Sequence, residues 1–336
     1  MKNILVICGP TASGKTSLAL SIAKEIFFPR SSVIPDPLRR SFSEASLIGN
    51  PSGKSVHILS ADSRQIYKGL DIITGKDIPA DLPSNIKFFG LDLVSPNQVF
   101  NVSDFVAYSQ KIITDSAEQN IPLIIVGGTG LYLKAITSNL LDVHVPPDKE
   151  LRSELEKLTL SDLKKRLEEL NPSKYSSLNN SDLNNPRRLI RAIEISYSFK
   201  QTNVIPGLTR NPEQFHDQNQ NFLWLGLKVD KQIQENKIHQ RVLDRLENGA
   251  IDEVKKLIPH YPDTSLPIHS SLGVKQIKEY LAGNISKEQL TDLWTKVEVD
   301  YARRQMVWFN KQSGIVWYDK DSINQELVAS LAEQLK

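Results

Sequence analysis

The chain has 336 residues, of which 40% are hydrophobic and 24% charged, and 41 basic side chains nearly balance 39 acidic ones, for a net charge of +2. This length and composition are typical of a globular protein with two domains, or with one core and a large insertion, and they exclude a disordered or collagen-like chain. The single cysteine, Cys8, excludes an intrachain disulfide and a cysteine-cluster zinc site. No apolar run approaches the ~18 residues of a membrane span, so we expect a cytoplasmic protein without a membrane partner.

The first part of the chain predicts a parallel sheet with helices between its strands. Residues 4–8 form a continuous apolar run, typical of a strand buried on both faces, and residues 16–25 have helical periodicity. Apolar runs at 56–61 and 123–126 predict two more buried strands, with a helix over 102–118 between them. This alternation favours an α/β core of parallel strands flanked by helices.

The sequence changes character after about residue 140. Residues 148–200 are charged and helical, and Asn185 followed by Pro186 is typical of a helix start. An apolar strand returns at residues 222–227, and long amphipathic helices follow. We therefore expect an α/β core over residues 1–142, an all-α insertion domain over 143–217, and a return to the core with C-terminal helices over 218–336.

Two polar stretches are typical of surface insertions. Residues 29–55 contain several prolines with many Ser and Arg residues, and residues 203–221 combine Pro206 and Pro212 with a polar Gln/Asn run. Neither stretch has sustained periodicity, so we expect both to be loop-like or disordered insertions.

A phosphate-binding motif follows the first predicted strand. Residues 9–16 fit the pattern G-x-x-x-x-G-K-[ST] and read Gly9, Pro10, Thr11, Ala12, Ser13, Gly14, Lys15 and Thr16. Backbone N–H groups and the start of the following helix would surround phosphate oxygens. Lys15 would bridge phosphates, and the Thr16 hydroxyl would ligate Mg²⁺. The motif predicts a bound phosphate chain but does not identify the molecule that carries it.

A carboxylate follows the strand predicted at 56–61. This residue is Asp62, whereas the strand at 123–126 ends in Gly127, Gly128 and Thr129 rather than in an acidic residue, which weakens a standard ATPase or GTPase interpretation. Ligands of open α/β sheets bind beyond the carboxyl ends of the strands, so Asp62 and the phosphate loop are expected to share one crevice. There Asp62 could hold Mg²⁺, act as a general base, or cap the next helix.

Two groups of arginines are candidates for anion binding. Arg187, Arg188 and Arg191 share one face of a predicted helix, which is either a phosphate-contacting surface or a solvated face with an ordinary Arg191–Glu194 pair. Arg304 falls on an otherwise apolar helical stripe between residues 290 and 308. A buried arginine needs an anionic partner, either a phosphate-bearing substrate or a structural carboxylate.

Taken together, the motifs resemble those of the tRNA dimethylallyltransferase family, the adenosine-37 isopentenyltransferases. The resemblance is carried in family order by 9–16 (GPTASGKT), 61–67 (ADSRQIY), 69–72 (GLDI), 126–132 (VGGTGLY), 185–194 (NPRRLIRAIE), 249–254 (GAIDEV) and 302–309 (ARRQMVWF). It implies a P-loop NTPase-like parallel sheet flanked by helices, with an all-α insertion domain. Independently of the resemblance, we expect a monomer, because the sequence shows no self-complementary stripe.

The resemblance also implies a reaction. The family transfers a dimethylallyl group from dimethylallyl diphosphate to N6 of adenine 37, beside the anticodon of tRNAs that read codons beginning with U. With Mg²⁺, the loop 9–16 and Arg304 would hold the diphosphate, and Lys15 would stabilise the leaving pyrophosphate. Asp62 would be the general base for an adenine flipped out of the anticodon loop, positioned with the help of Thr129. The implied contacts with the tRNA anticodon stem-loop are Asp62, Ser63, Arg64, Gln65, Thr129, Arg152, Arg187, Arg188 and Arg191.

The chain departs from the family pattern at several places. Glu298 and Val299 stand where the family usually has Thr-Arg, and Phe88-Phe89 replaces a His-His pair. The pattern Gly-Thr-Ala-Lys-Pro appears as residues 73–77 (ITGKD), and the stretch 29–55 lengthens the chain before Asp62. None of these changes removes Lys15, Thr16, Asp62 or Thr129.

Two other functions use some of the same features. A P-loop kinase acting on a small molecule with ATP would share the phosphate loop, but it would leave the arginine helix and residues 62–65 without a role. A non-catalytic RNA-binding protein with a degenerate loop conflicts with the intact Lys15, Thr16 and Asp62.

Overall fold

The computed structural model of the chain describes residues 3–27, 55–79, 81–138, 145–202 and 221–336. They form two compact units: a core unit, Met1–Thr137 with Asn219–Lys336, and a helical unit, Ser138–Gln218. The stretches predicted as insertions, 29–55 and 203–221, lie outside the described residues apart from Ser55 and Asn221.

The core unit is built on a sheet that has, in the described residues, six parallel strands in the order β3-β2-β4-β1-β5-β6. The strands are β1 (Asn3–Cys8), β2 (Val56–Ser60), β3 (Ile86–Phe89), β4 (Leu123–Gly127), β5 (Asn221–Lys228) and β6 (Val316–Asp319). In the register of the central strands, Leu5 of β1 lies between Ile124 of β4 and Leu223 of β5. The predicted parallel α/β core is therefore confirmed.

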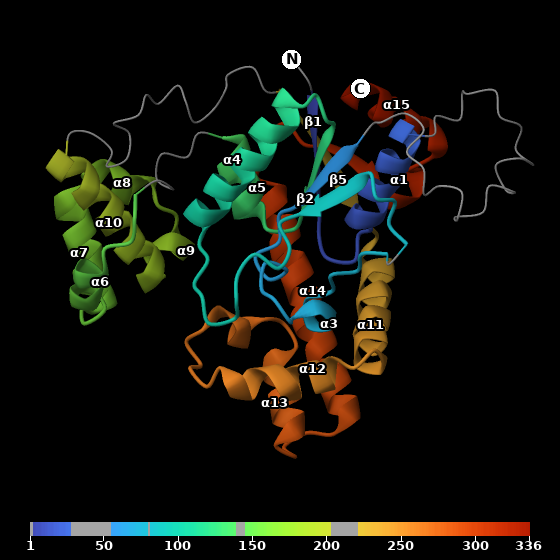
Figure 1. Cartoon of the computed structure of the whole chain (residues 1–336). Coiled ribbons are helices and arrows are strands. Elements are labelled where there is room, and N and C mark those ends of the chain that lie inside the picture. Colours follow the sequence, from blue (N-terminus) through green and yellow to red (C-terminus); the bar gives the residue numbers. More distant parts are fainter. Residues whose placement is uncertain (1–2, 28–54, 80, 139–144, 203–220) are drawn as a thin grey trace, which may run out of the picture. The chain divides into compact units, whose positions relative to one another are not determined.

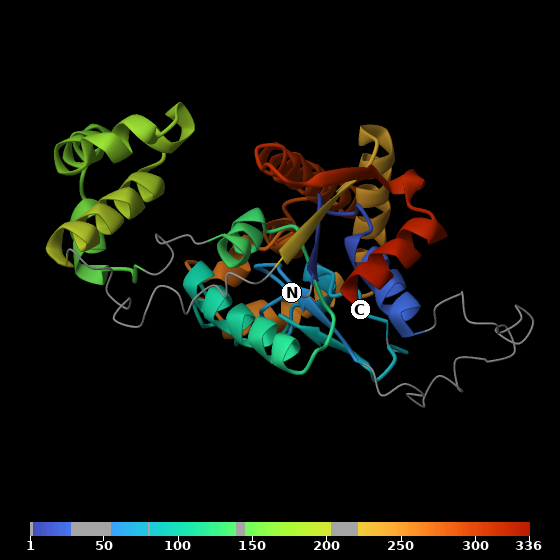
Figure 2. The same ribbon diagram turned by 90° about the horizontal axis from the view of Figure 1, so that it is seen from above.

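Helices cover both faces of this sheet (Figures 1 and 2). Helices α1 (Lys15–Phe27) and α15 (Gln325–Leu335) pack on one face, and α4 (Val102–Glu118) and α5 (Gly130–Thr137) pack on the other. Because side chains alternate along a strand, Leu5 and Ile7 pack toward α1, whereas Ile4 and Val6 pack toward α4. Burial of each such side chain contributes about 1.5–3 kcal/mol, which fixes the sheet as the rigid base of the molecule.

A second group of helices packs together below the sheet in the view of Figure 1. It consists of α3 (Asp71–Thr74), α11 (Lys231–Glu247), α12 (Ala250–Leu257), α13 (Val274–Leu281) and α14 (Lys287–Phe309). Short 3₁₀ turns at Ile258–His260, Pro267–Ser270 and Lys320–Ser322 connect elements of the core unit. Trp294 of α14 and Tyr67 are fully buried in the apolar cluster that joins these helices.

The helical unit consists, in its described residues, of helices around one small apolar core. They are α6 (Lys149–Leu155), α7 (Leu160–Leu170), α8 (Pro172–Ser177), α9 (Asn180–Leu183) and α10 (Pro186–Thr202). Leu163 and Leu167 of α7 pack against Leu189 and Ile193 of α10. The predicted start of α10 is confirmed, since the Asn185 side chain accepts the Arg188 N–H at 3.3 Å.

Parallel strands bring three functional segments to one edge of the sheet. β1 leads into the phosphate loop, β2 leads to Asp62, and β4 leads to Thr129. The ends of β2 and β4 approach closely because position 127 is glycine: a Cβ there would lie 2.3 Å from the Ala61 carbonyl oxygen.

Candidate active site

A cavity of about 820 Å³ opens at this edge of the sheet, within the size range of small-molecule sites. It is bordered by Thr11, Ala12, Gly14, Lys15 and Thr16 of the phosphate loop and by Asp62, Ser63, Arg64 and Gln65. Segments more than 40 residues apart in the sequence therefore meet around one space, as the crevice rule for α/β sheets predicts.

Gln305 of α14 links the phosphate loop to the end of β4. The Thr11 N–H donates to Gln305 Oε1 at 2.8 Å, and Gln305 Nε2 donates to the Gly128 carbonyl at 2.9 Å. Lys15 Nζ donates to the Pro10 carbonyl at 2.6 Å. The Ser13 hydroxyl is buried and has no hydrogen-bond partner among the described residues. A buried polar atom without a partner is costly, but Ser13 does not border the cavity, so its hydroxyl is not assigned to a ligand there.

Arg241 of α11 is a cavity residue that was not singled out in the sequence analysis. Its guanidinium donates to Thr11 Oγ1 at 3.1 Å and pairs with Asp77 at 2.6 Å. Burial, reinforced by the charge of Arg241, lowers the pKa of Lys15 to about 8. Two cations thus stand at the phosphate loop with only part of their charge balanced by protein carboxylates, which favours an anionic ligand.

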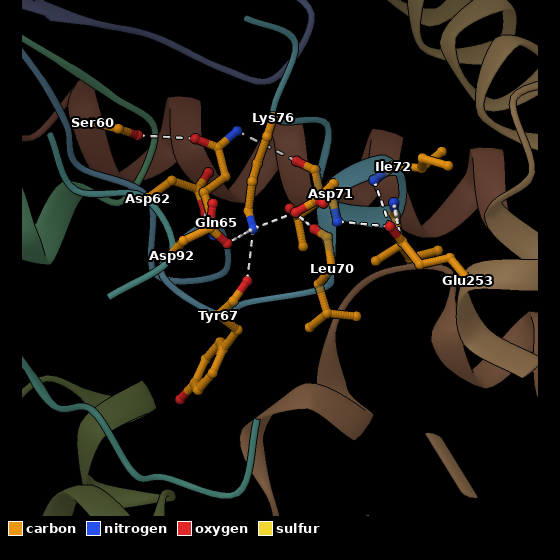
Figure 3. Close-up of polar contacts among 12 residues, drawn as sticks. Ser60, Asp62, Gln65, Tyr67, Leu70, Asp71, Ile72, Lys76, Asp92 and Glu253 are labelled. Carbon is orange, nitrogen blue, oxygen red and sulfur yellow. Dashed lines mark hydrogen bonds and ion pairs between the residues drawn. The ribbon is translucent and has the colours of Figure 1, made fainter. Parts of the chain in front are cut away.

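Asp62 is held at one carboxylate oxygen. Its Oδ1 accepts the N–H of Arg64 at 2.8 Å and that of Gln65 at 3.4 Å, whereas Oδ2 has no hydrogen-bond partner among the described residues. Residues 62–67, the Asp62 turn, therefore fix the direction of the carboxylate (Figure 3). The helix-capping alternative is not what the structure shows, because residues 63–66 form a turn that Oδ1 stabilises, and Oδ2 is left available at the cavity.

Thr129 contacts the same turn, and Tyr301 contacts Thr129. The Ser63 N–H donates to Thr129 Oγ1 at 3.1 Å, and the Tyr301 hydroxyl hydrogen-bonds the Thr129 side chain. Burial raises the pKa of Tyr301 to about 12, helped by the negative charge of Asp62, so this hydroxyl keeps its proton. The sequence placed Tyr301 on an apolar stripe and gave no sign of this contact.

The expectation that Arg304 is buried on the apolar stripe is wrong. Arg304 is exposed at the border of the cavity, with its guanidinium carbon 5.9 Å from the centre of the Tyr301 ring. The buried face of α14 instead includes three polar residues, Thr291, Glu298 and Gln305, and is rotated away from position 304. The buried arginine is Arg245 of α11, which pairs with Glu298 at 2.7 Å.

In the helical unit, the candidate tRNA-contacting arginines are largely engaged with carboxylates. Arg152 makes two hydrogen bonds to Glu194, at 2.6 and 2.7 Å, and Arg191 pairs with Glu194 at 3.2 Å and donates to the Val145 carbonyl at 2.7 Å. Burial alone would raise the pKa of Glu194, but these hydrogen bonds hold it below its ordinary value.

The other two arginines of this group lie at the start of α10. Arg188 pairs with Asp182, and Arg187 is exposed. The ordinary Arg191–Glu194 pair considered from the sequence is therefore present, and Arg187 is the member of the group without a carboxylate partner among the described residues.

Within the residues that the structure describes, no three His, Cys, Asp or Glu side chains group as a metal site. A Mg²⁺ ion needs less, because it is commonly held by one or two protein oxygens together with substrate phosphates. Thr16 and Asp62 offer oxygens at the same cavity and fit that requirement. Among the described helices, none has the length and apolarity to cross a membrane.

Comparisons with known proteins agree on one family. A family model described as IPP transferase matches residues 65–312. The tRNA dimethylallyltransferase of Acetivibrio thermocellus is 33% identical over 97% of this chain and 94% of its own length, and that of Acaryochloris marina is 32% identical over 97% and 95%.

Solved structures of tRNA-modifying transferases have a similar fold. The full-length tRNA isopentenylpyrophosphate transferase of Bacillus halodurans matches with a TM-score of 0.63 at 27% identity, covering 99% of this chain and 95% of that one. A eukaryotic dimethylallyltransferase acting on tRNA matches with a TM-score of 0.73 over 99% of this chain and 78% of that one, and at 21% identity it shows the fold alone.

Proposed function

The chain belongs to the IPP transferase family, and on that premise we propose that it transfers a dimethylallyl group from dimethylallyl diphosphate to N6 of adenine 37 in tRNAs that read codons beginning with U. The observation that carries the proposal is one cavity bordered both by the phosphate loop with Lys15 and by the carboxylate of Asp62. A diphosphate holder and a proton acceptor are the two parts that this reaction requires.

The diphosphate lies in the loop 9–16. Its oxygens accept from loop N–H groups and from Lys15, and Arg241 adds a second cation beside Thr11. Thr16 would hold Mg²⁺ together with phosphate oxygens, and the ion would neutralise charge on the leaving group. Negative charge grows on pyrophosphate as it departs, so these cations stabilise the transition state more than the ground state.

Adenine enters the cavity from the RNA by base flipping. Its N6 attacks the allylic carbon, the C–O bond to the diphosphate breaks, pyrophosphate leaves, and the N6 proton passes to Asp62 Oδ2. The Thr129–Ser63 contact holds the Asp62 turn in place while this happens. An exocyclic amine is a weak nucleophile, so the position of the base contributes more than its strength.

The helical unit provides contacts with the tRNA. Arg187 is the first candidate, because it is exposed and α10 places it beside Arg188 and one turn from Arg191. Ser63, Arg64 and Gln65 are candidates near the flipped base. The Arg64 guanidinium also donates to the Pro267 carbonyl at 2.6 Å, so part of it already serves the fold. A monomeric state and a cytoplasmic location stay predictions.

The roles of the base and of the donor are tested in a single-turnover assay with Mg²⁺, labelled dimethylallyl diphosphate and unmodified tRNA. Asp62→Asn keeps the Oδ1 acceptor that orders the turn but removes the base. We expect transfer to slow by roughly 10²–10⁴-fold while tRNA binding stays within several-fold. Turnover close to that of the unsubstituted enzyme would remove Asp62 from the mechanism.

A competition experiment separates this function from the kinase alternative. Unlabelled dimethylallyl diphosphate should displace the labelled donor, and ATP at equal concentration should not. ATP turnover without prenyl transfer would instead support a P-loop kinase, and tRNA binding without either activity would support a non-catalytic RNA-binding protein.

A further inference from the structure

The amine of Lys76 is buried beside the active-site cavity and is saturated with acceptors. Nζ donates to the Tyr67 carbonyl at 2.7 Å and to the carboxylates of Asp71, at 2.7 Å, and of Asp92 (Figure 3). The Lys76 side chain is only 5% exposed. An ammonium group carries three N–H donors, so none remains for a phosphate or a nucleotide. Lys76 therefore serves the fold around the cavity rather than a ligand inside it.

Two of these acceptors connect Lys76 to the Asp62 turn. Tyr67 is the last residue of that turn, and the Asp92 N–H donates to the Gln65 carbonyl at 3.1 Å. Asp92 has φ 52, a left-handed conformation that non-glycine residues adopt only where their surroundings hold them. The ion pair with Lys76 is one of those constraints, so a single amine fixes both Asp92 and the end of the turn.

The segment that carries Lys76, residues 71–76, also hydrogen-bonds the Asp62 turn through Gln65. The Gln65 Oε1 accepts from the Ser60 hydroxyl at 2.9 Å, and Nε2 donates to the Gly75 carbonyl at 2.8 Å (Figure 3). Gly75 and Lys76 are neighbours, so one short piece of chain holds the turn at two points. The direction of the Asp62 carboxylate depends on this turn, because Oδ1 is held by N–H groups within it.

The start of this segment is hydrogen-bonded to α12. The Glu253 carboxylate of α12 accepts the N–H groups of Asp71, Ile72 and Ile73, at 2.7 to 2.9 Å, at the start of α3 (Figure 3). These bonds satisfy the orphan donors of the short helix. Residues 71–76 therefore connect α12 to the Asp62 turn through hydrogen bonds at both of their ends.

We propose that Lys76 is a positioning residue for the reaction, acting through the Asp62 turn on the base. This inference rests on the proposed function, since it assigns Lys76 to the proton-transfer half of that reaction and not to diphosphate binding. A displacement of about 1 Å at a reacting group can cost 10²-fold in rate. Without the Lys76 ammonium, the carboxylates of Asp71 and Asp92 repel each other across the emptied position, and the turn loses its hold at Tyr67.

The test compares Lys76→Met with Lys68→Met. Lys68 follows the Asp62 turn directly and is exposed, so its substitution removes the same charge from a nearby position in the chain without removing a buried contact. In single-turnover assays Lys76→Met should transfer the prenyl group about 10²-fold more slowly than Lys68→Met. The dissociation constant for dimethylallyl diphosphate should change by less than about threefold, because no N–H of Lys76 reaches the donor.

Coupling to Asp62 distinguishes positioning from a general structural role. In an Asp62→Asn background the base is already absent, so adding Lys76→Met should slow transfer by less than about threefold further. An equal loss in both backgrounds, or a loss that follows donor affinity or thermal stability, would overturn the assignment. So would equal rates for Lys76→Met and Lys68→Met.

If Lys76→Met does not fold, Asp92→Asn tests the same positioning role. Asparagine tolerates the left-handed conformation but removes one charge partner of the ammonium. A slower transfer with unchanged donor affinity supports the positioning role, and an unchanged rate refutes it. Absence of transfer by the unsubstituted enzyme would instead contradict the proposed function itself.

Discussion

The pKa of Lys15 makes donor binding depend on pH in a specific direction. Burial and the charge of Arg241 lower this pKa to about 8, so the amine of the free enzyme is charged below that pH and neutral above it. A bound diphosphate favours the charged form and so raises the pKa back toward its ordinary value of 10.5. Affinity for dimethylallyl diphosphate is therefore full below about pH 8 and is lost as the pH rises.

The size of the effect follows from the two pKa values. Between pH 7.5 and 9.5 the free enzyme loses most of its Lys15 protons while the complex keeps most of them, which weakens binding by roughly 10- to 20-fold. Burial raises the pKa of Cys8 and of Tyr301 to about 12, so neither group titrates in this window. The phosphate oxygens of the donor, with a last pKa near ~6, are also ionised throughout.

Equilibrium binding of labelled dimethylallyl diphosphate, without tRNA and at constant ionic strength, measures this dependence. Lys15→Arg is the control, because a guanidinium stays charged over the whole range, and its dissociation constant should be flat with pH. If the dissociation constant of the unsubstituted enzyme is also flat between pH 7.5 and 9.5, then Lys15 is either not desolvated or not paired with the diphosphate, and this part of the account is wrong.

Two further predictions concern stability and RNA binding. Glu298→Thr, which restores the residue usual in the family, should destabilise the fold by about 3–5 kcal/mol in urea unfolding, because it leaves the buried Arg245 uncompensated. The double variant with Arg245→Met should recover most of that loss, and a single-variant change below about 1 kcal/mol would show that the pair is not needed. Arg187→Gln should weaken tRNA binding and reduce the slope of log affinity against log salt by about one. Binding that is unchanged at every salt concentration would show that this part of α10 is only a solvated surface.

The sheet could be predicted from sequence where burial is complete. β1 and β4 are continuous apolar runs because both of their faces are covered by helices, and such runs are typical of fully buried strands. The edge strands β3 and β6 were not predicted, because each has four residues, only partly buried, and carries little pattern. The final helix, α15, falls among the C-terminal helices expected over residues 218–336, but its own position was not predicted, although it covers one face of the sheet.

The residues of the active site also differ in whether the sequence reveals them. The phosphate loop and Asp62 are recognisable because their function depends on residues that are adjacent in sequence. Arg241 and Tyr301 are not, since their partners Thr11 and Thr129 lie far away along the chain and meet them only in the fold. The error over Arg304 has a related cause: the buried face of α14 includes polar side chains, and an apolar stripe drawn without them points in the wrong direction.

The most direct test of the central claim is the location of the transferred group. Purified protein with Mg²⁺ and labelled dimethylallyl diphosphate is incubated with an unmodified tRNA that reads codons beginning with U, and the RNA is digested and analysed by mass spectrometry. The account predicts label on N6 of adenine 37 alone, and none when that position carries guanine. Label at another position, or no label in RNA that the protein still binds, would contradict it.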